Sequence, residues 1–215
     1  MNNKPLPLPD IASLRQHPLT WCVLVLSCIP FMLMDKQDLS GLSLWFMPDN
    51  LAGLLEPFSV WRIWSPSFVH YTYGHLLTNM YLFWYFSSKI EAVSLIQLVV
   101  ICTACAAISN LSQWLMTGPD FGGLSGVIYA LLAYAWVMEY LTKKPLYLVH
   151  APLKCLLLIA LPIYATGWLG KYANYAHISG LVSGALCALA YLHFLSRGAR
   201  ATRPSAPTNN KDTDG

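Results

Sequence analysis

Four polar side chains in this otherwise apolar chain are of types that together perform acyl transfer. They are Ser125, His177, His75 and Asn79. Acyl transfer by a nucleophile needs a hydroxyl that attacks, a base that takes its proton, and hydrogen-bond donors for the oxyanion that forms. Each of the four residues stands at or near the start of an apolar segment. Whether they form one site depends on the elements that position them.

Those elements are predicted to be membrane-spanning helices. Of the 215 residues, 56% are hydrophobic and 11% are charged, whereas soluble domains average about 25% charged residues. A span needs roughly 20 mostly apolar residues. We therefore predict an all-α, polytopic membrane protein built as a six-transmembrane-helix bundle, and we exclude a water-soluble enzyme, a disordered chain and a coiled coil. The six predicted spans cover about residues 18–34, 75–92, 94–113, 124–142, 149–169 and 174–196.

The basic residues predict how these spans run across the membrane, because lysine and arginine accumulate in cytoplasmic loops. With the N-terminus inside, ten basic residues fall on inner segments, and only Lys36, Arg62 and Lys171 fall on outer ones. We therefore expect both termini in the cytoplasm. The segments that start at His75, Ser125 and near His177 then all begin just below the outer surface, at one depth.

The same pattern predicts the organisation of the chain. Residues 1–17 form a short cytoplasmic N-terminus, and residues 18–196 form one domain with a long first loop at residues 35–74. The polar residues 197–215 are expected to be a disordered cytoplasmic tail. The aromatic stretch from Trp61 to Trp64 suggests that the first loop lies partly in the outer interface. Its role could be packing and anchoring, or substrate access.

Each candidate residue also has an ordinary structural interpretation. A serine at a helix start is most often an N-cap, and a histidine at a helix end is usually an interfacial residue with an apolar body and a polar tip. Their common depth favours one shared site, because chance is a poor explanation for three separate segments that place these polar residues at the same depth. No carboxylate lies near His177 in sequence, where a third triad member should stand, so the residues predict a Ser-His dyad.

The neighbours of Ser125 strengthen this prediction. Gly123 and Leu124 belong to a glycine-rich turn that exposes the hydroxyl, and the helix that follows directs its free N–H groups towards developing negative charge. Tyr129 lies one turn further along the same helix face, where its ring could pack against the imidazole of His177. Small residues every four positions in the last span predict close helix contact. They are Gly180, Gly184 and Ala188.

The cysteines do not indicate redox or metal chemistry. All six lie inside predicted spans, where cysteine acts as a small hydrophobic residue. The Cys102-x-x-Cys105 pair would suggest redox or metal chemistry in a soluble fold, but no neighbouring cluster supports that here. We expect no cofactor and no metal. The net charge of +3 is too small and too dispersed to indicate nucleic-acid binding.

Three blocks of sequence resemble the signature motifs of one family. These blocks are His75-Leu-Leu-Thr-Asn79, Phe121-Gly-Gly-Leu-Ser125-Gly-Val-Ile-Tyr129, and Ala176-His177-Ile-Ser-Gly180-Leu-Val-Ser-Gly184. In this order they look like those of rhomboid intramembrane serine proteases, most of all the bacterial GlpG type, over about residues 58–196. The pair Trp61-Arg62 also resembles the first-loop motif of the family.

The resemblance implies that Ser125 is the nucleophile, that His177 is the general base, and that the Ser125 N–H forms the oxyanion hole with the side chains of His75 and Asn79. It implies that single-pass transmembrane proteins are cleaved near the outer surface of the bacterial inner membrane, at a site that opens to the periplasm. His70 resembles a family loop histidine with a structural role. Supporting roles are implied for Tyr129, Gly123, Leu124, Gly180 and Gly184.

Two features depart from the family pattern. Only about 17 residues precede the first predicted span, so we expect a GlpG-type chain without the N-terminal cytoplasmic domain. Glu91 lacks the arginine that usually follows it in the family, which puts an ion pair there in doubt. A different class of function is a catalytically silent rhomboid-like protein that binds transmembrane helices. A small transporter is a third class, but no inverted repeat is evident.

Overall fold

The structure is a computed structural model that describes residue 9 and residues 11–34, 40–166 and 173–201. All the regular secondary structure in the described part is helical, with no strand, so the predicted all-α class is confirmed. The α-helices are α1 (Pro18–Leu33), α2 (Leu51–Leu55), α3 (Tyr73–Glu91), α4 (Leu95–Thr117), α5 (Ser125–Thr142), α6 (Ala151–Ala165) and α7 (Asn174–Ala201). Short 3-10 helices cover Ile11–Arg15, Ser40–Trp45, Val60–Ile63, Ser65–Phe68 and Pro145–Tyr147.

Six long helices correspond to the six predicted spans, with shifts at their ends. Helix α3 begins two residues earlier than expected, and α7 continues five residues further, to Ala201. The five-residue helix α2 in the first loop was not predicted. Lys4, Lys36 and Lys171, used to predict orientation, and residues 202–215 of the predicted tail lie outside the described residues.

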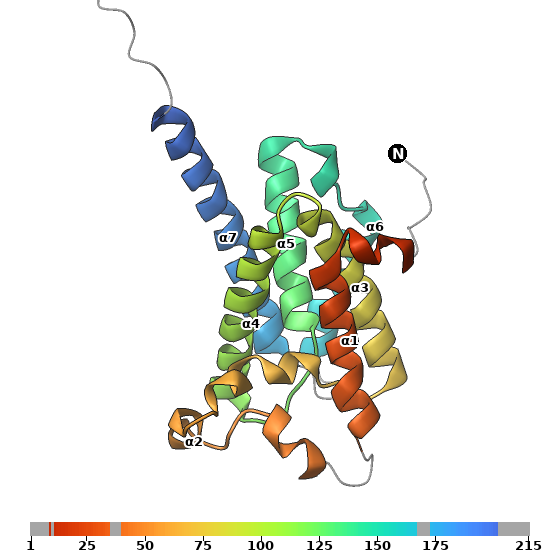
Figure 1. The fold of residues 1–215 in the computed structure, drawn as a ribbon, viewed down its shortest axis with the longest axis vertical. Coiled ribbons are helices and arrows are strands. Elements are labelled where there is room, and N and C mark those ends of the chain that lie inside the picture. Colours follow the sequence, from red (N-terminus) through yellow and green to blue (C-terminus); the bar gives the residue numbers. More distant parts are fainter. Residues whose placement is uncertain (1–8, 10, 35–39, 167–172, 202–215) are drawn as a thin grey trace, which may run out of the picture.

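Helix α5 runs through the centre of the bundle, with α4 and α7 on one side and α3 and α1 on another (Figure 1). Eleven of its eighteen residues are buried, so protein rather than lipid surrounds most of it. The starts of α3, α5 and α7 lie at the end of the bundle that carries α2 and the first loop. Helix α1 begins, and α7 ends, at the opposite end. The arrangement thus brings the three polar helix starts to one level.

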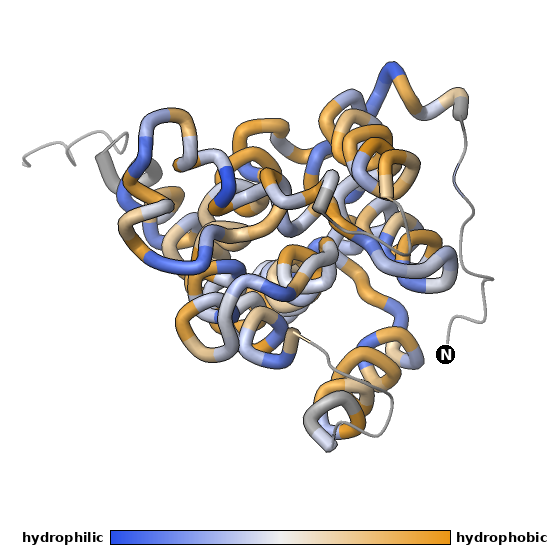
Figure 2. Tube along the Cα trace, turned by 90° about the horizontal axis from the view of Figure 1, so that it is seen from below, coloured by the Kyte–Doolittle hydropathy of each residue, from blue (hydrophilic) through white to orange (hydrophobic). Residues whose placement is uncertain are grey.

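The outer helices present apolar side chains to their surroundings. Ile96 and Leu115 of α4 are 74% exposed, and Leu186 of α7 is 60% exposed. Hydrophobic residues run along the outer helices as well as through the interior (Figure 2). In the described part, α4 and residues Asn174–Arg197 of α7 are long and apolar enough to cross a membrane by length and composition, while Pro18–Leu33 and Ala151–Ile163 are shorter apolar helices. Large exposed apolar surfaces of this kind mark contact with lipid or with other proteins.

The first loop is tied to the bundle by side chains that bind its backbone carbonyls. The guanidinium of Arg62 donates to the carbonyls of Phe46 and Ser43, at 2.7 and 2.9 Å. From α4, the amide of Asn110 donates to the Ile63 carbonyl at 2.8 Å. These bonds satisfy backbone groups that the irregular chain leaves unpaired. They also fix the segment that leads into α3.

The carboxylate of Glu91, at the end of α3, completes the start of α1. It accepts the backbone N–H of Leu19 at 2.8 Å and both the N–H and the hydroxyl of Thr20, at 2.9 and 2.6 Å. Pro18 has no N–H, and the N–H of Trp21 already donates to the backbone carbonyl of His17. Every N–H in the first turn of α1 is therefore accounted for. The positive end of the helix dipole also lies beside the negative charge. Glu91 thus has a stabilising partner that needs no arginine.

This arrangement predicts that Glu91→Ala destabilises the fold. The change removes a buried carboxylate that accepts three hydrogen bonds, and we expect the unfolding free energy to fall by about 3 kcal/mol. The measurement is the thermal unfolding midpoint of the full chain in neutral detergent. Glu56→Ala, at an exposed acidic residue in the first loop, is the control. Equal midpoints for the two variants would show that the Glu91 contacts contribute nothing.

Candidate active site

Ser125 and His177 lie within hydrogen-bond distance across the contact between α5 and α7. The Nε2 atom of His177 is 2.8 Å from the Oγ of Ser125. Ser125 is the first residue of α5, and the N-cap position belongs to Leu124, which makes no side-chain cap. The serine hydroxyl therefore faces the imidazole instead of capping its own helix. His177 lies in the first turn of α7 and is 3% exposed.

Glycines allow α5 and α7 to approach so closely. A Cβ atom on Gly180 would collide with the carbonyl of Gly126, and one on Gly184 would collide with the carbonyl of Ala130. Both contacts are with backbone, which cannot rotate away as a long side chain could. Small residues at this spacing let helix backbones touch. The distance between serine and histidine depends on that contact.

His75 and Asn79 project from α3 towards the turn that precedes Ser125. Gly123 has a φ of +122°, and a Cβ atom there would lie 2.7 Å from Nε2 of His75 and 3.3 Å from Nδ2 of Asn79. Any side chain at this position would be strained and would occupy the space between these donors and the turn. Asn79 is 5% exposed, and its Nδ2 has no hydrogen-bond partner among the described residues. A buried donor without a partner is costly unless something else accepts its hydrogen bond.

Two backbone N–H groups of the same turn have partners in the first loop. The N–H of Gly123 donates to the Pro66 carbonyl at 2.9 Å, and the N–H of Leu124 points to Nε2 of His70 at 3.5 Å. The first N–H groups of a helix have no partner within it, and that of Ser125 comes first in α5. The side chains of His75 and Asn79 and the N–H of Ser125 are therefore the candidate hydrogen-bond donors near the serine hydroxyl.

Tyr129 packs against the histidine and anchors its ring to a third helix. The ring centroids of Tyr129 and His177 are 4.8 Å apart. The Tyr129 hydroxyl donates to the Leu157 carbonyl of α6 at 2.8 Å. The aromatic ring thus limits how far the imidazole can turn, while the hydroxyl keeps a buried polar partner.

His70 joins the first loop to the turn that carries the serine. Its Nδ1 lies 3.0 Å from the Phe68 carbonyl, which accepts a hydrogen and places the proton on Nδ1. Nε2 is then the acceptor that faces the Leu124 N–H. Burial lowers the pKa of His70 to about 3, and neighbouring His75 contributes to the decrease. The imidazole is therefore neutral at neutral pH, as this pair of contacts requires.

The low pKa of His70 predicts a pH-dependent stability. Below its ordinary pKa of 6.5, His70 binds a proton in the unfolded chain but not in the folded chain. Its contribution to the free energy of unfolding is therefore complete above pH 6.5 and is lost as the pH falls from 6.5 to about 3. We expect His70→Gln to lower the thermal midpoint at pH 7 and the difference from the unmodified protein to shrink towards pH 4. Melting curves in detergent across this range provide the measurement. A difference that stays constant with pH would contradict the role of His70 titration.

Sequence reasoning missed Gln113, a buried carboxamide on α4 that holds the start of α7. Its Oε1 accepts the N–H of Ala176, the residue before His177, at 3.2 Å. Its Nε2 donates to the Thr117 hydroxyl at 2.7 Å, and Gln113 is 3% exposed. The carboxamide satisfies one of the free N–H groups at the start of α7. In the sequence, the only signal was a carboxamide within an apolar segment, which Gln97 and Asn110 of the same segment share.

We predict that Gln113 positions His177. Gln113→Leu leaves the Ala176 N–H without an acceptor, so the turnover number should fall by about tenfold, roughly 1.4 kcal/mol. Gln113→Glu keeps an acceptor oxygen and should recover much of the activity. The turnover number and the thermal midpoint of each variant are measured side by side. Loss of stability without loss of turnover in Gln113→Leu would assign Gln113 a purely structural role.

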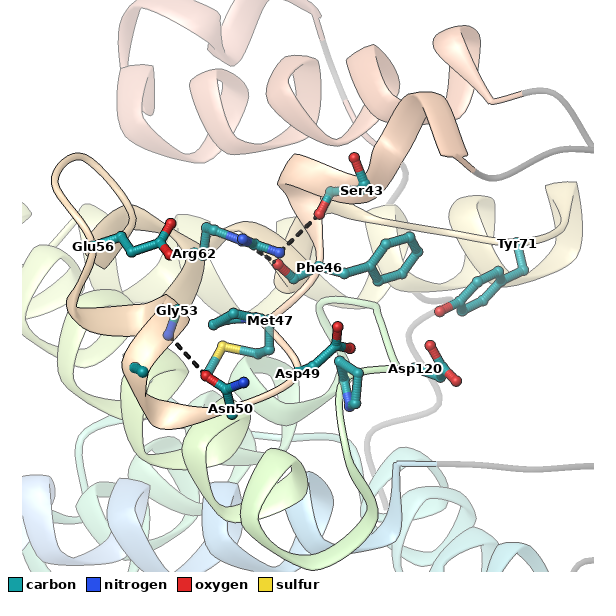
Figure 3. Close-up of a pocket in the computed structure, with 13 residues that line it drawn as sticks. Ser43, Phe46, Met47, Asp49, Asn50, Gly53, Glu56, Arg62, Tyr71 and Asp120 are labelled. Carbon is teal, nitrogen blue, oxygen red and sulfur yellow. Dashed lines mark hydrogen bonds between the residues drawn. The ribbon is translucent and has the colours of Figure 1, made fainter.

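A cavity of about 880 Å³ lies between the first loop and residues Pro119 and Asp120 of the loop before α5, and none of the four candidate catalytic residues lines it. Tyr71 lines it beside Asp120 (Figure 3), and the Tyr71 ring stacks on His75 at 6.3 Å between centroids. Burial, with a contribution from the negative charge of Asp120, raises the pKa of Tyr71 to about 12. The phenol therefore stays protonated at neutral pH. Tyr71 thus connects this cavity to His75 through the contact between their rings.

Within the described residues, no group of three or more His, Cys, Asp or Glu side chains is placed to hold a metal ion. The six cysteines are free thiols. The groups that could perform chemistry here are a hydroxyl, an imidazole and hydrogen-bond donors. Fold and site together define a helical protein with the constituents of a serine hydrolase at one end of its bundle.

Comparison with known proteins places this chain in a family. The family model described as "Rhomboid domain" matches residues 57–194. The "Rhomboid protease GlpG" of Klebsiella pneumoniae subsp. pneumoniae is 33% identical over 204 residues, which cover 90% of this chain and 70% of the relative. The protein of the same name from Salmonella choleraesuis is 32% identical over 203 residues, covering 89% and 70%. The chain belongs to the rhomboid family, and it is an intramembrane serine protease of the GlpG type.

Proposed function

We propose that Ser125 and His177 form the catalytic dyad of this protease, and that the side chains of His75 and Asn79 with the Ser125 N–H form its oxyanion hole. The observation that carries the proposal is the 2.8 Å contact between Ser125 Oγ and His177 Nε2. Gly123, Leu124, Gly180, Gly184 and Tyr129 support the site through the backbone and ring contacts described above.

In this mechanism His177 Nε2 takes the hydroxyl proton as Ser125 Oγ attacks the scissile carbonyl carbon. The carbonyl oxygen gains the negative charge, which the three donors stabilise more strongly than the neutral carbonyl. The intermediate then collapses, the C–N bond breaks, and His177 gives its proton to the departing amine. In the second half, water attacks the acyl carbon while His177 takes its proton. The ester C–O bond then breaks, His177 returns the proton to Ser125 Oγ, and the carboxyl product leaves.

The substrates we propose are single-pass transmembrane proteins, cleaved near the outer surface of the bacterial inner membrane. Hydrolysis needs water, which the hydrocarbon excludes. A site at the end of the bundle that carries the first loop and the cavity beside Tyr71 can be wet while the rest of the substrate stays in lipid. The excess of basic residues on the predicted inner segments supports cytoplasmic termini and a site that opens to the periplasm.

The test is cleavage of a single-pass model substrate by purified full-length variants. We expect Ser125→Ala to abolish cleavage, and Asn79→Ala to reduce it by about 100- to 1,000-fold, the usual cost of one oxyanion donor. Ser179→Ala is the matched control, because its hydroxyl binds the Tyr175 carbonyl of its own helix at 2.6 Å.

A second measurement separates the protease from a silent rhomboid-like binder. A fluorophosphonate probe reacts covalently with an activated serine, so it should label the unmodified protein and the Ser179→Ala control but not Ser125→Ala. Full cleavage by Ser125→Ala would refute the proposed nucleophile. Substrate binding without either cleavage or labelling in the unmodified protein would favour the silent binder.

A further inference from the structure

A second cavity lies at the opposite end of the bundle from Ser125. Its volume is about 420 Å³, and it is formed by the last two turns of α5 and the loop that follows. The residues that line it are Trp136, Glu139, Tyr140, Lys143, Lys144, Pro145 and Leu148. None of them takes part in the proposed catalytic chemistry.

The charge around this cavity is positive. Lys143 and Lys144 are exposed, and neither forms an ion pair among the residues that the structure describes. Glu139 is the one carboxylate in the lining, and Lys154 Nζ binds it at 2.6 Å. Its Oε2 also lies 3.4 Å from the Val149 N–H. The negative charge of Glu139 is thus offset, while the charges of the two lining lysines remain available.

The backbone and an aromatic ring position one of these lysines. Lys143 has a φ of +56° at the end of α5, and its N–H donates to the Glu139 carbonyl at 3.0 Å. The left-handed conformation is uncommon for a residue other than glycine. The ammonium lies 4.5 Å from the centroid of the Tyr140 ring. The positive charge is therefore held at the rim of the cavity by a cation–π contact.

Three of the residues that line the cavity have large apolar or aromatic side chains that are partly exposed. Trp136 is 39% exposed, Tyr140 is 68% exposed and Leu148 is 44% exposed. Tryptophan and tyrosine concentrate at the headgroup level of membranes. A ligand that fits both the lysines and the exposed apolar side chains has an anionic group and an apolar tail.

We propose that this cavity binds the headgroup of an anionic phospholipid. The phosphodiester would lie near the ammonium groups of Lys143 and Lys144, with the acyl chains along the exposed side of Trp136 and Leu148. Basic pockets beside membrane-spanning helices are suited to such headgroups. A soluble phosphate would use the two charges but not the apolar side, so the combination favours the lipid.

The experiment measures lipid binding to the full-length protein in neutral detergent micelles, by native mass spectrometry. The probes are phosphatidylglycerol, phosphatidylcholine and inorganic phosphate. At about 1 kcal/mol for each lysine, Lys143→Gln/Lys144→Gln should weaken phosphatidylglycerol binding by roughly 25-fold. The matched control is Arg15→Gln/Arg197→Gln, which removes two positive charges from the same end of the bundle but outside the cavity; its binding should change by less than about threefold.

The outcomes decide the proposal. Binding of phosphatidylglycerol about tenfold or more tighter than phosphatidylcholine, lost in the cavity variant and kept in the control, supports it. Equal binding of both lipids, equal loss in both double variants, or complete displacement of the lipid by millimolar phosphate would overturn it. Because both lysines are exposed, the cavity variant should keep the thermal midpoint of the unmodified protein. If it does not, Lys144→Gln alone, expected to weaken binding about fivefold, takes its place in the comparison.

Discussion

The contact between the backbones of α5 and α7 is the constraint on which the rest of the site depends. Serine and histidine side chains are short, so a 2.8 Å bond between them requires helices that nearly touch. Lipid supplies no hydrophobic force to press helices together, and close packing must supply it instead. Gly180 and Gly184 make that packing possible because no Cβ atom separates them from the α5 backbone. The candidate chemistry is thus set by residues that have no functional group.

Polar groups around the site are held by neighbours from distant segments. The first loop contributes the Pro66 carbonyl and the His70 imidazole to the turn before Ser125. Helix α4 contributes the Gln113 carboxamide to the start of α7. Each contact satisfies a backbone N–H that a turn or a helix start leaves free. A rigid polar end can therefore exist on an apolar bundle. The amide nitrogen of Asn79 is one of several buried side-chain atoms without a partner among the described residues, and it lies beside the turn that precedes Ser125.

Much of this arrangement was predictable from the sequence, because gaps between charges show where helices cross and the common depth of Ser125 and His177 follows from the alternation of spans. The all-helical fold and the family agree with those predictions. Partners across helices were not predictable. Gln113 and Glu91 each stand in a segment whose sequence does not show which distant N–H groups they accept. Helix α2 escaped prediction because five residues within a loop give no periodic pattern.

The Glu91 contact also bears on the order in which the protein is assembled. The amide groups it accepts, on Leu19 and Thr20, are synthesised about seventy residues before the carboxylate itself. Chains emerge from the ribosome N-terminus first. Until α3 is in place, these amides must stay in contact with water or lipid headgroups, since the hydrocarbon offers no acceptor. Helix α1 can therefore enter the bilayer early, but its first turn reaches its final environment only when α3 docks beside it.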